Sequence, residues 1–169
     1  TVISAAESEP ETASSTAEAS SDPTADYPEG KLFITVERSQ YQSGGMTLTV
    51  PKLGLTEIPV LPDVDDETLK SGVGLYEYAQ MPGTGNRNVS IAGHRDIYGE
   101  EFYDIDKLAE GDEFYLTYEG KRYTYVYKDT KIVEADDWSP IYIQGFSCLT
   151  LTSCTPIGVA SHRIIVRAE

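Results

Sequence analysis

The chain has 169 residues and a formal charge of −15 at pH 7. That length predicts one domain with room for a flanking segment, and so acidic a chain is poorly suited to bind nucleic acid or anionic lipid, because their phosphates would repel it. No run of about 18 apolar residues is present, so no membrane-spanning helix is predicted. Because the sequence begins with Thr1 rather than Met, we expect a processed product whose signal or anchor segment lay upstream.

The first 30 residues differ in composition from the rest. They are rich in Ala, Ser, Thr, Glu and Pro and contain no Lys or Arg. Such a segment cannot bury enough apolar surface to offset the entropy lost on ordering. We therefore predict a disordered acidic linker over residues 1–30 and a folded domain over residues 31–169. The linker is either a tail without function, a stalk below a membrane anchor, or a lid folded over the domain.

From Lys31 onward the chain alternates in short runs rich in Val, Ile, Thr, Tyr and Phe, which is typical of strands. The predicted strands are 32–36, 46–53, 57–61, 88–94, 113–119, 122–134, 148–154 and 162–168. Glu119-Gly120-Lys121 predicts a hairpin turn. Short helices are expected at 65–70, capped by Asp63 or Asp65, and at 100–108. The fold class is therefore mostly all-β, an antiparallel barrel or sandwich of about eight strands.

The two cysteines, Cys148 and Cys154, fall on one predicted strand, six positions apart. That spacing is about 20 Å in a strand, whereas a disulfide needs Cα atoms within about 7 Å. At least one cysteine should therefore be a free thiol. Cys154 ends its strand and precedes the loop signal Thr155-Pro156-Ile157-Gly158, so substrate could reach it. Cys148 has no charged neighbour in the sequence and is interpreted as a small buried residue.

A reactive thiol needs a nearby cation to lower its pKa from about 8.5. His94 follows the apolar run 89–92 and Gly93, and Arg163 lies near the start of the last strand. Alternation there puts Arg163 on the more polar face and His162 on an inward face. Two alternatives to a catalytic role stay open. His94 taken alone could be a structural, hydrogen-bonded histidine at a strand end, and Arg163 taken alone could be a solvated arginine. His162 is the rival acid/base.

Three motifs together resemble the signature of the sortases. They are Thr150-Leu151-Thr152-Ser153-Cys154, then Arg163-Ile164-Ile165-Val166, and upstream Ile91-Ala92-Gly93-His94-Arg95. Residues 50–55, 58–60 and 106–112 are similar to other parts of that family, so the resemblance covers about residues 45–168. Ser153 stands where the family pattern usually has Thr, and it keeps the hydroxyl.

The resemblance implies an eight-stranded β-barrel and a cysteine transpeptidase, grouped with peptide hydrolases. Cys154 would be the nucleophile, His94 the acid/base and Arg163 the anion-stabilising residue, with Thr152 and Ser153 binding substrate. The substrate would be a Leu-Pro-x-Thr-Gly-like sorting signal on surface proteins or pilins. The acyl group would pass to an amine of a cell-wall precursor or pilin. The enzyme would face the cell wall of a Gram-positive-type bacterium, held by an anchor outside this chain.

The class of sortase stays open between two types. Residues 154–156, 162–163 and 166–167 resemble the pilin-polymerising class C, whereas 72–76 and 82–86 resemble class D. Asp22-Pro23 is followed by Thr24, so the aromatic anchor of a class C lid is absent, which favours an enzyme without a lid.

No cofactor is expected. Asp63 with the pairs Asp65-Asp66 and Asp136-Asp137 offers oxygen ligands for calcium, but the spacing fits no EF-hand loop and favours a solvated surface. The His and Cys residues lack the close pairs of a zinc site. The rival function is a non-catalytic adhesive or structural β-domain, which would not explain a strand-end thiol. A papain-like hydrolase would carry its cysteine early, near the start of a long helix.

Overall fold

The computed structural model describes residues 30, 34–83, 86–94, 101–155 and 161–169, without the side chains of Asp66, Cys154 and Thr155. The predicted linker over 1–30 and the expected lid anchor at 22–24 therefore lie outside the described residues, apart from Gly30.

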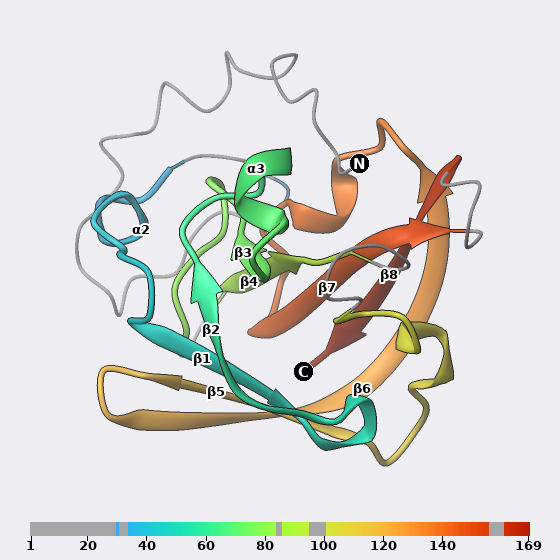
Figure 1. Ribbon diagram of the computed structural model, residues 1–169, viewed down its shortest axis with the longest axis horizontal. Coiled ribbons are helices and arrows are strands. Elements are labelled where there is room, and N and C mark those ends of the chain that lie inside the picture. Colours follow the sequence, from blue (N-terminus) through green and yellow to red (C-terminus); the bar gives the residue numbers. More distant parts are fainter. Residues whose placement is uncertain (1–29, 31–33, 84–85, 95–100, 156–160) are drawn as a thin grey trace.

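The described strands form a closed eight-stranded barrel in the order β1-β2-β3-β4-β7-β8-β6-β5 (Figure 1). They are β1 (Met46–Val50), β2 (Leu55–Leu61), β3 (Val73–Leu75), β4 (Asn88–Ala92), β5 (Glu113–Tyr118), β6 (Lys121–Glu134), β7 (Cys148–Thr155) and β8 (His162–Ala168). The helical pieces are short: α2 (Val36–Ser39), α3 (Asp66–Leu69) and the 3₁₀ turns Pro51–Leu53, Ile105–Lys107 and Ser139–Ile141. The prediction of a mostly all-β, eight-stranded barrel with short helices is confirmed.

Two pairs of neighbouring strands are parallel, which corrects the expectation of an antiparallel barrel. β2 runs parallel to β3, and β4 runs parallel to β7. Parallel neighbours need long crossover connections. β2 reaches β3 through α3, and the whole β5–β6 hairpin lies between β4 and β7 in the chain. Strand-like composition does not reveal which distant strand becomes a neighbour.

The strand predicted over 32–36 is wrong in its described part, residues 34–36, and one strand was missed. Val36 begins α2 instead of ending a strand, because the Thr35 side chain accepts a hydrogen bond from the Arg38 amide (3.1 Å) and caps the helix. The missed strand is β3, whose three residues are too few to show alternation. A Cβ on Gly74 would lie 1.8 Å from the Asp63 carbonyl oxygen, so only glycine fits this close approach.

The predicted turn and helix cap agree with the structure better than the predicted strand boundaries do. Glu119 (φ 53°) and Gly120 (φ 79°) join β5 to β6 in a two-residue turn with both φ angles positive, as type I′ hairpins require. The Asp65 carboxylate accepts a hydrogen bond from the Thr68 amide (2.8 Å) and caps α3. The helix predicted over 100–108 is reduced to a 3₁₀ turn at Ile105–Lys107 in its described part.

The barrel core is built from alternate residues of its strands, and β4 is buried along its whole length. Core side chains come from opposite walls of the barrel, for example Leu48, Leu116, Leu149, Leu151, Ile164 and Val166. Burying each such side chain stabilises the fold by about 1.5–3 kcal/mol before the entropy cost. Because β4 is buried on both faces, the segment after β6 must cover its outer face.

Candidate active site

β4, β7 and β8 are neighbouring strands of the barrel (Figure 1). The three predicted catalytic residues lie just after the end of β4, near the end of β7 and near the start of β8. Cys154 on β7 is paired with Arg163 on the antiparallel strand β8. On the other side of β7, Thr152 is paired with Ala92 of the parallel strand β4. His94 and Cys154 each follow this pair by two residues. The strand register therefore places Cys154 between the positions of His94 and Arg163.

Hydrogen bonds fix the backbone around His94 to β7. The Gly93 amide donates to the Thr152 carbonyl (3.1 Å), and the Ser153 hydroxyl donates to the Gly93 carbonyl (2.7 Å). The His94 carbonyl accepts from the Phe102 amide (3.1 Å). The imidazole itself is buried, with 4% of the residue exposed. The backbone at His94 is thus fixed relative to the Cys154 backbone, by bonds to β7 before it and by the bond to Phe102.

Arg163 is a buried cation rather than a solvated one. Only 6% of the residue is exposed, and its Nη1 donates to the His162 carbonyl (2.9 Å). The alternative of a solvated strand arginine is therefore wrong. A permanent positive charge held at the strand end opposite Cys154 is the environment that favours a thiolate.

Thr152 and Ser153 lie beneath this edge and are both buried. The Thr152 hydroxyl is hydrogen-bonded to the Tyr76 hydroxyl (2.9 Å), and Ser153 donates to Gly93 as described above. Their predicted role in binding substrate stays a prediction. The contacts present in the structure hold strands together instead.

His162 differs from the expectation of an inward side chain. It lies on the same face of β8 as the core residues Ile164 and Val166, but its side chain at the strand end is 40% exposed. Its Nδ1 is hydrogen-bonded to the Ser161 hydroxyl (2.9 Å), and its Nε2 lies 3.3 Å from the Glu134 carboxylate. His162 is thus held on the face of β8 that alternates with that of Arg163, which favours His94 as the acid/base.

Cys148 is a free thiol with no exposed surface. Burial raises the pKa of the Cys148 thiol to about 11, although the charge of Arg167 and a hydrogen bond with Thr150 oppose this shift. Cys148 has no charged neighbour in the sequence, but the fold brings the charge of Arg167, on β8, close enough to act on it. Its interpretation as a structural residue fits a thiol that stays protonated at neutral pH.

The segment between β6 and β7 is fastened over the outer face of these strands by polar residues that sequence reasoning missed. Asn88 donates both amide protons, to the carbonyls of Pro140 and Tyr142 (2.9 Å each), and Arg167 Nη2 donates to Pro140 (2.9 Å). The Asn88 side-chain oxygen accepts from the Thr150 hydroxyl (2.6 Å). An asparagine opening the otherwise apolar run of β4 was the available signal.

Two of the acidic residues considered for calcium accept hydrogen bonds from nearby backbone amides. Asp65 caps α3, and the Asp137 carboxylate accepts from the Ser139 amide (2.9 Å). No group of three or more His, Cys, Asp or Glu side chains that could hold a metal ion occurs in the described ranges. No helix in that part of the chain is long and apolar enough to cross a bilayer.

Comparison with known proteins decides the family. The family model for the sortase domain matches residues 48–169, which is most of the chain. The chain belongs to the sortase family. Sortase D of Bacillus subtilis (strain 168) is 34% identical over 129 residues, covering 74% of this sortase and 62% of that protein. Sortase A of Bacillus anthracis is 30% identical over 123 residues, covering 72% and 57%. This sortase thus spans about 60% of the length of these curated relatives.

Solved structures agree with this family and with the barrel. Streptococcus pneumoniae sortase C superposes with a TM-score of 0.68 at 33% identity, covering 76% of this sortase and 66% of that chain. Corynebacterium diphtheriae sortase A gives a TM-score of 0.70 at 25% identity, covering 76% and 61%. These two structures come from different classes, sortase C and sortase A, so they do not decide between the class C and class D alternatives.

Proposed function

We propose that this sortase is a cysteine transpeptidase that cleaves a Leu-Pro-x-Thr-Gly-like sorting signal and transfers the acyl group to an amine. One observation carries the proposal: the register of β4, β7 and β8 places Cys154 between a buried histidine and a buried arginine. Burying such groups is costly unless other interactions compensate.

In the first half of the reaction, the Cys154 thiolate attacks the threonine carbonyl of the signal and a C–S bond forms. Arg163 stabilises the negative charge that develops on the carbonyl oxygen. The C–N bond then breaks, and the His94 imidazolium gives its proton to the leaving amine. A thioester to Cys154 remains.

In the second half, the acceptor amine attacks the thioester carbonyl. Neutral His94 takes a proton from this amine, a new amide bond forms and the Cys154 thiolate leaves. The cycle returns thiolate and imidazolium to their starting states. Splitting one acyl transfer into two steps in this way is the purpose of a covalent nucleophile.

The proposed partners are surface proteins or pilins bearing a sorting signal, and a cell-wall precursor or pilin that supplies the amine. The proposed location is extracytoplasmic, on an anchored protein facing a Gram-positive-type cell wall. Similarity to a class D relative and to class C structures supports this setting. The crystal structure of Streptococcus pneumoniae sortase C bears on pilin substrate specificity in that protein, which makes pilin transfer one arm of the test.

The test incubates the full chain with a panel of sorting-signal peptides and amine acceptors, and follows intact mass. We expect an acyl-enzyme on Cys154 that disappears when the right amine is added. Cys154→Ala should abolish cleavage while the fold is kept, and the matched variant Cys148→Ala should retain most activity. Equal loss in both variants would contradict the assignment of the nucleophile.

Separate His94→Ala and His162→Ala variants distinguish the two candidate acid/base residues. We expect cleavage to collapse only in the first. The rival non-catalytic domain is tested by labelling with a vinyl sulfone or a methanethiosulfonate at neutral pH. A catalytic Cys154 should react selectively, whereas a structural domain should show no such preference.

A further inference from the structure

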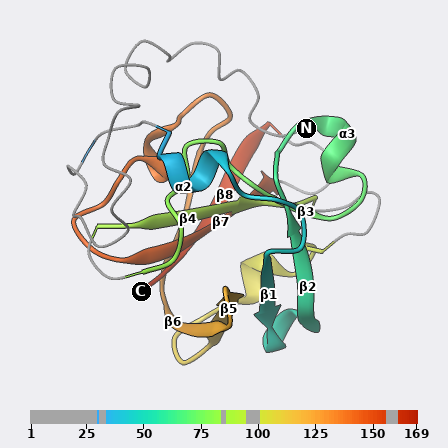
Figure 2. The same cartoon turned by 90° about the vertical axis from the view of Figure 1, so that its left-hand side faces the viewer.

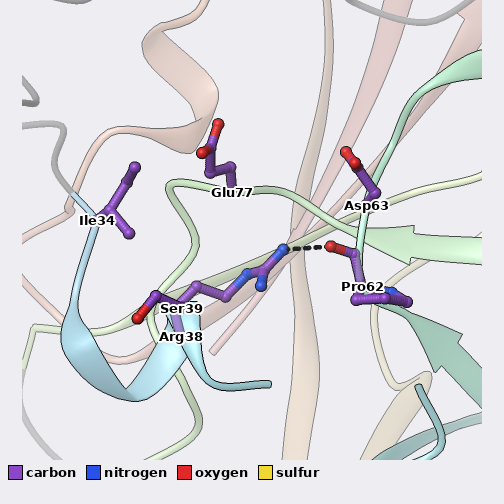
Figure 3. Close-up of a pocket in the computed structure, with 6 residues that line it drawn as sticks. All are labelled: Ile34, Arg38, Ser39, Pro62, Asp63 and Glu77. Atoms are coloured by element: carbon purple, nitrogen blue, oxygen red, sulfur yellow. Dashed lines mark hydrogen bonds between the residues drawn. The ribbon is translucent and has the colours of Figure 1, made fainter. Parts of the chain in front are cut away.

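Arg38 is a buried arginine of α2, a helix that lies outside the barrel strands in both views (Figures 1 and 2). Only 5% of the residue is exposed. Its Nη2 donates to the Pro62 carbonyl (2.8 Å), as Figure 3 shows. Its Nε donates to the Tyr76 carbonyl (2.8 Å), and Nη2 also donates to the Leu75 carbonyl (2.9 Å). One guanidinium thus binds three backbone oxygens from two separate segments.

The parallel pairing of β2 and β3 explains why three carbonyls converge there. Leu61 pairs with Gly74, so the next residues, Pro62 and Leu75, leave the ladder side by side. Their carbonyls and that of Tyr76 need donors, and the planar fork of an arginine supplies several in fixed directions. A lysine carries its donors on one nitrogen and cannot reproduce this geometry.

The surroundings of Arg38 keep it charged. Ile34, Arg38, Ser39, Pro62, Asp63 and Glu77 line a hollow of about 240 Å³ (Figure 3). Burial lowers the pKa of Arg38, and the negative charges of Glu77 and Asp63 oppose that shift. The guanidinium therefore acts as a charged donor, and hydrogen bonds from charged groups are stronger than neutral ones.

Tyr76, which Arg38 holds, touches both strands that carry the proposed reacting residues. Its amide donates to the Ser90 carbonyl of β4 (3.0 Å), and its hydroxyl is bonded to Thr152 of β7 (2.9 Å). Its ring packs edge-on against Trp138 at 6.1 Å. Tyr76 is itself 1% exposed, so in this arrangement it acts on neighbouring strands and not on a bound peptide.

We propose that Arg38 is a positioning residue. Through Tyr76 it fixes the position of β4 along its neighbour β7, and thereby the position of His94 relative to Cys154. This inference rests on the proposed transpeptidase function. Its physical basis is one continuous path: Arg38 to the Tyr76 backbone, Tyr76 hydroxyl to Thr152, and Thr152 carbonyl to the Gly93 amide. Thr152 precedes Cys154 by two residues, and Gly93 precedes His94.

The test compares Arg38→Lys with the matched control Tyr41→Phe in the full chain. The Tyr41 hydroxyl accepts from the Met46 amide (3.0 Å) and donates to the Val60 carbonyl of β2 (2.5 Å). Its loss weakens the anchoring of the segment after α2 without removing a hydrogen bond of Tyr76. The phenylalanine keeps the ring over which the Arg38 guanidinium lies at 5.9 Å. Acylation by a cleaved peptide, thiol-labelling rate and the midpoint of urea unfolding are measured for both.

We expect Arg38→Lys to lower kcat for acylation about tenfold or more, since small misplacements of reacting groups cost this much, while KM stays within about twofold because no substrate contact is lost. The labelling rate of Cys154 should fall with it. Tyr41→Phe should lower only the unfolding midpoint. Equal kcat in the two variants would overturn the proposal and leave Arg38 a purely structural residue.

Tyr76→Phe provides a second variant in case Arg38→Lys does not fold. It removes one buried hydroxyl and should lower kcat in the same way, and an unchanged kcat would overturn the proposal. Combined with Arg38→Lys, its effect on kcat should be less than the product of the single effects, because both act on one path. If the parent acylates no peptide, the proposed function fails separately, and the labelling rates still decide the role of Arg38.

Discussion

Gly93→Ala tests whether close packing behind His94 holds the proposed site in place. A Cβ at this position would lie 2.8 Å and 3.0 Å from Phe102 Cδ2 and Cε2, and 3.1 Å from Val73 Cγ1. Carbon atoms normally approach to about 3.5–4.0 Å. Phe102 is completely buried and cannot swing into solvent. Either the ring or the Gly93 backbone must therefore shift.

The size of the effect follows from these contacts. Overpacking of a well-packed core costs about 1–3 kcal/mol of unfolding free energy, and the Gly93 amide and carbonyl are both bonded to β7. A backbone shift at Gly93 moves His94 directly. We expect kcat/KM for acylation to fall about tenfold to a hundredfold, together with the loss of stability.

Urea unfolding and the rate of acyl-enzyme formation measure the two effects on one preparation. The control is Phe102→Leu, which shortens the opposing side chain. The double variant should be more stable than the sum of the single changes predicts, by about 1 kcal/mol, because the pair shares one space. A Gly93→Ala protein with the stability and rate of the parent, or strict additivity in the double variant, would refute the reasoning.

Three further predictions concern stability. The pKa of Cys148 is raised in the folded protein to about 11 from its ordinary 9.0, so its contribution to stability is complete below about pH 9 and is lost as the pH rises towards 11. Between about pH 8 and about pH 10.5, the unfolding free energy measured in urea should fall more in the parent than in Cys148→Ala. An equal fall in the two proteins would contradict this prediction. Gly74→Ala should cost about 3 kcal/mol or more, because its Cβ would lie 1.8 Å from the Asp63 carbonyl oxygen and backbone must move; a parent-like unfolding midpoint would contradict this. Asp65→Ala should lower the unfolding free energy by about 1 kcal/mol through loss of the cap to the Thr68 amide, whereas Asp65→Asn should retain most of it, and equal unfolding free energies in the two variants would argue against the cap.

Features that depend on a few consecutive residues were predictable from the sequence. The Glu119-Gly120 turn needs two positive φ angles, and the cap of α3 needs a short side chain with an accepting oxygen three residues before Thr68. The eight-stranded barrel was also predicted, but the strand count agreed only because the missed strand β3 balanced the strand predicted over 32–36, which residues 34–36 do not form. Alternation of apolar and polar residues reveals neither feature. The helix at Val36 depends on a single capping threonine, and β3 has only three residues.

For the candidate site, the motifs identified His94, Cys154 and Arg163 as a set, and the register places them at one edge. Tyr76, Asn88 and Arg38 had no comparable signal. Their importance lies in hydrogen bonds to backbone carbonyls of distant segments, such as Pro140 and Pro62. Any buried donor can satisfy a carbonyl, so the side chain alone does not reveal which oxygen it meets.

The sequence by itself determined most of the segments that become strands and turns, because side-chain branching, φ preference and capping act between residues close in the chain. It also determined the types of reacting groups, since only two histidines and two cysteines are present. The tertiary structure alone decided that β4 and β7 are parallel neighbours, that Arg167 lies beside Cys148, and that Arg163 is buried. Those outcomes depend on barrel closure, which joins strands separated by many residues and sets burial and charge by what packs from elsewhere.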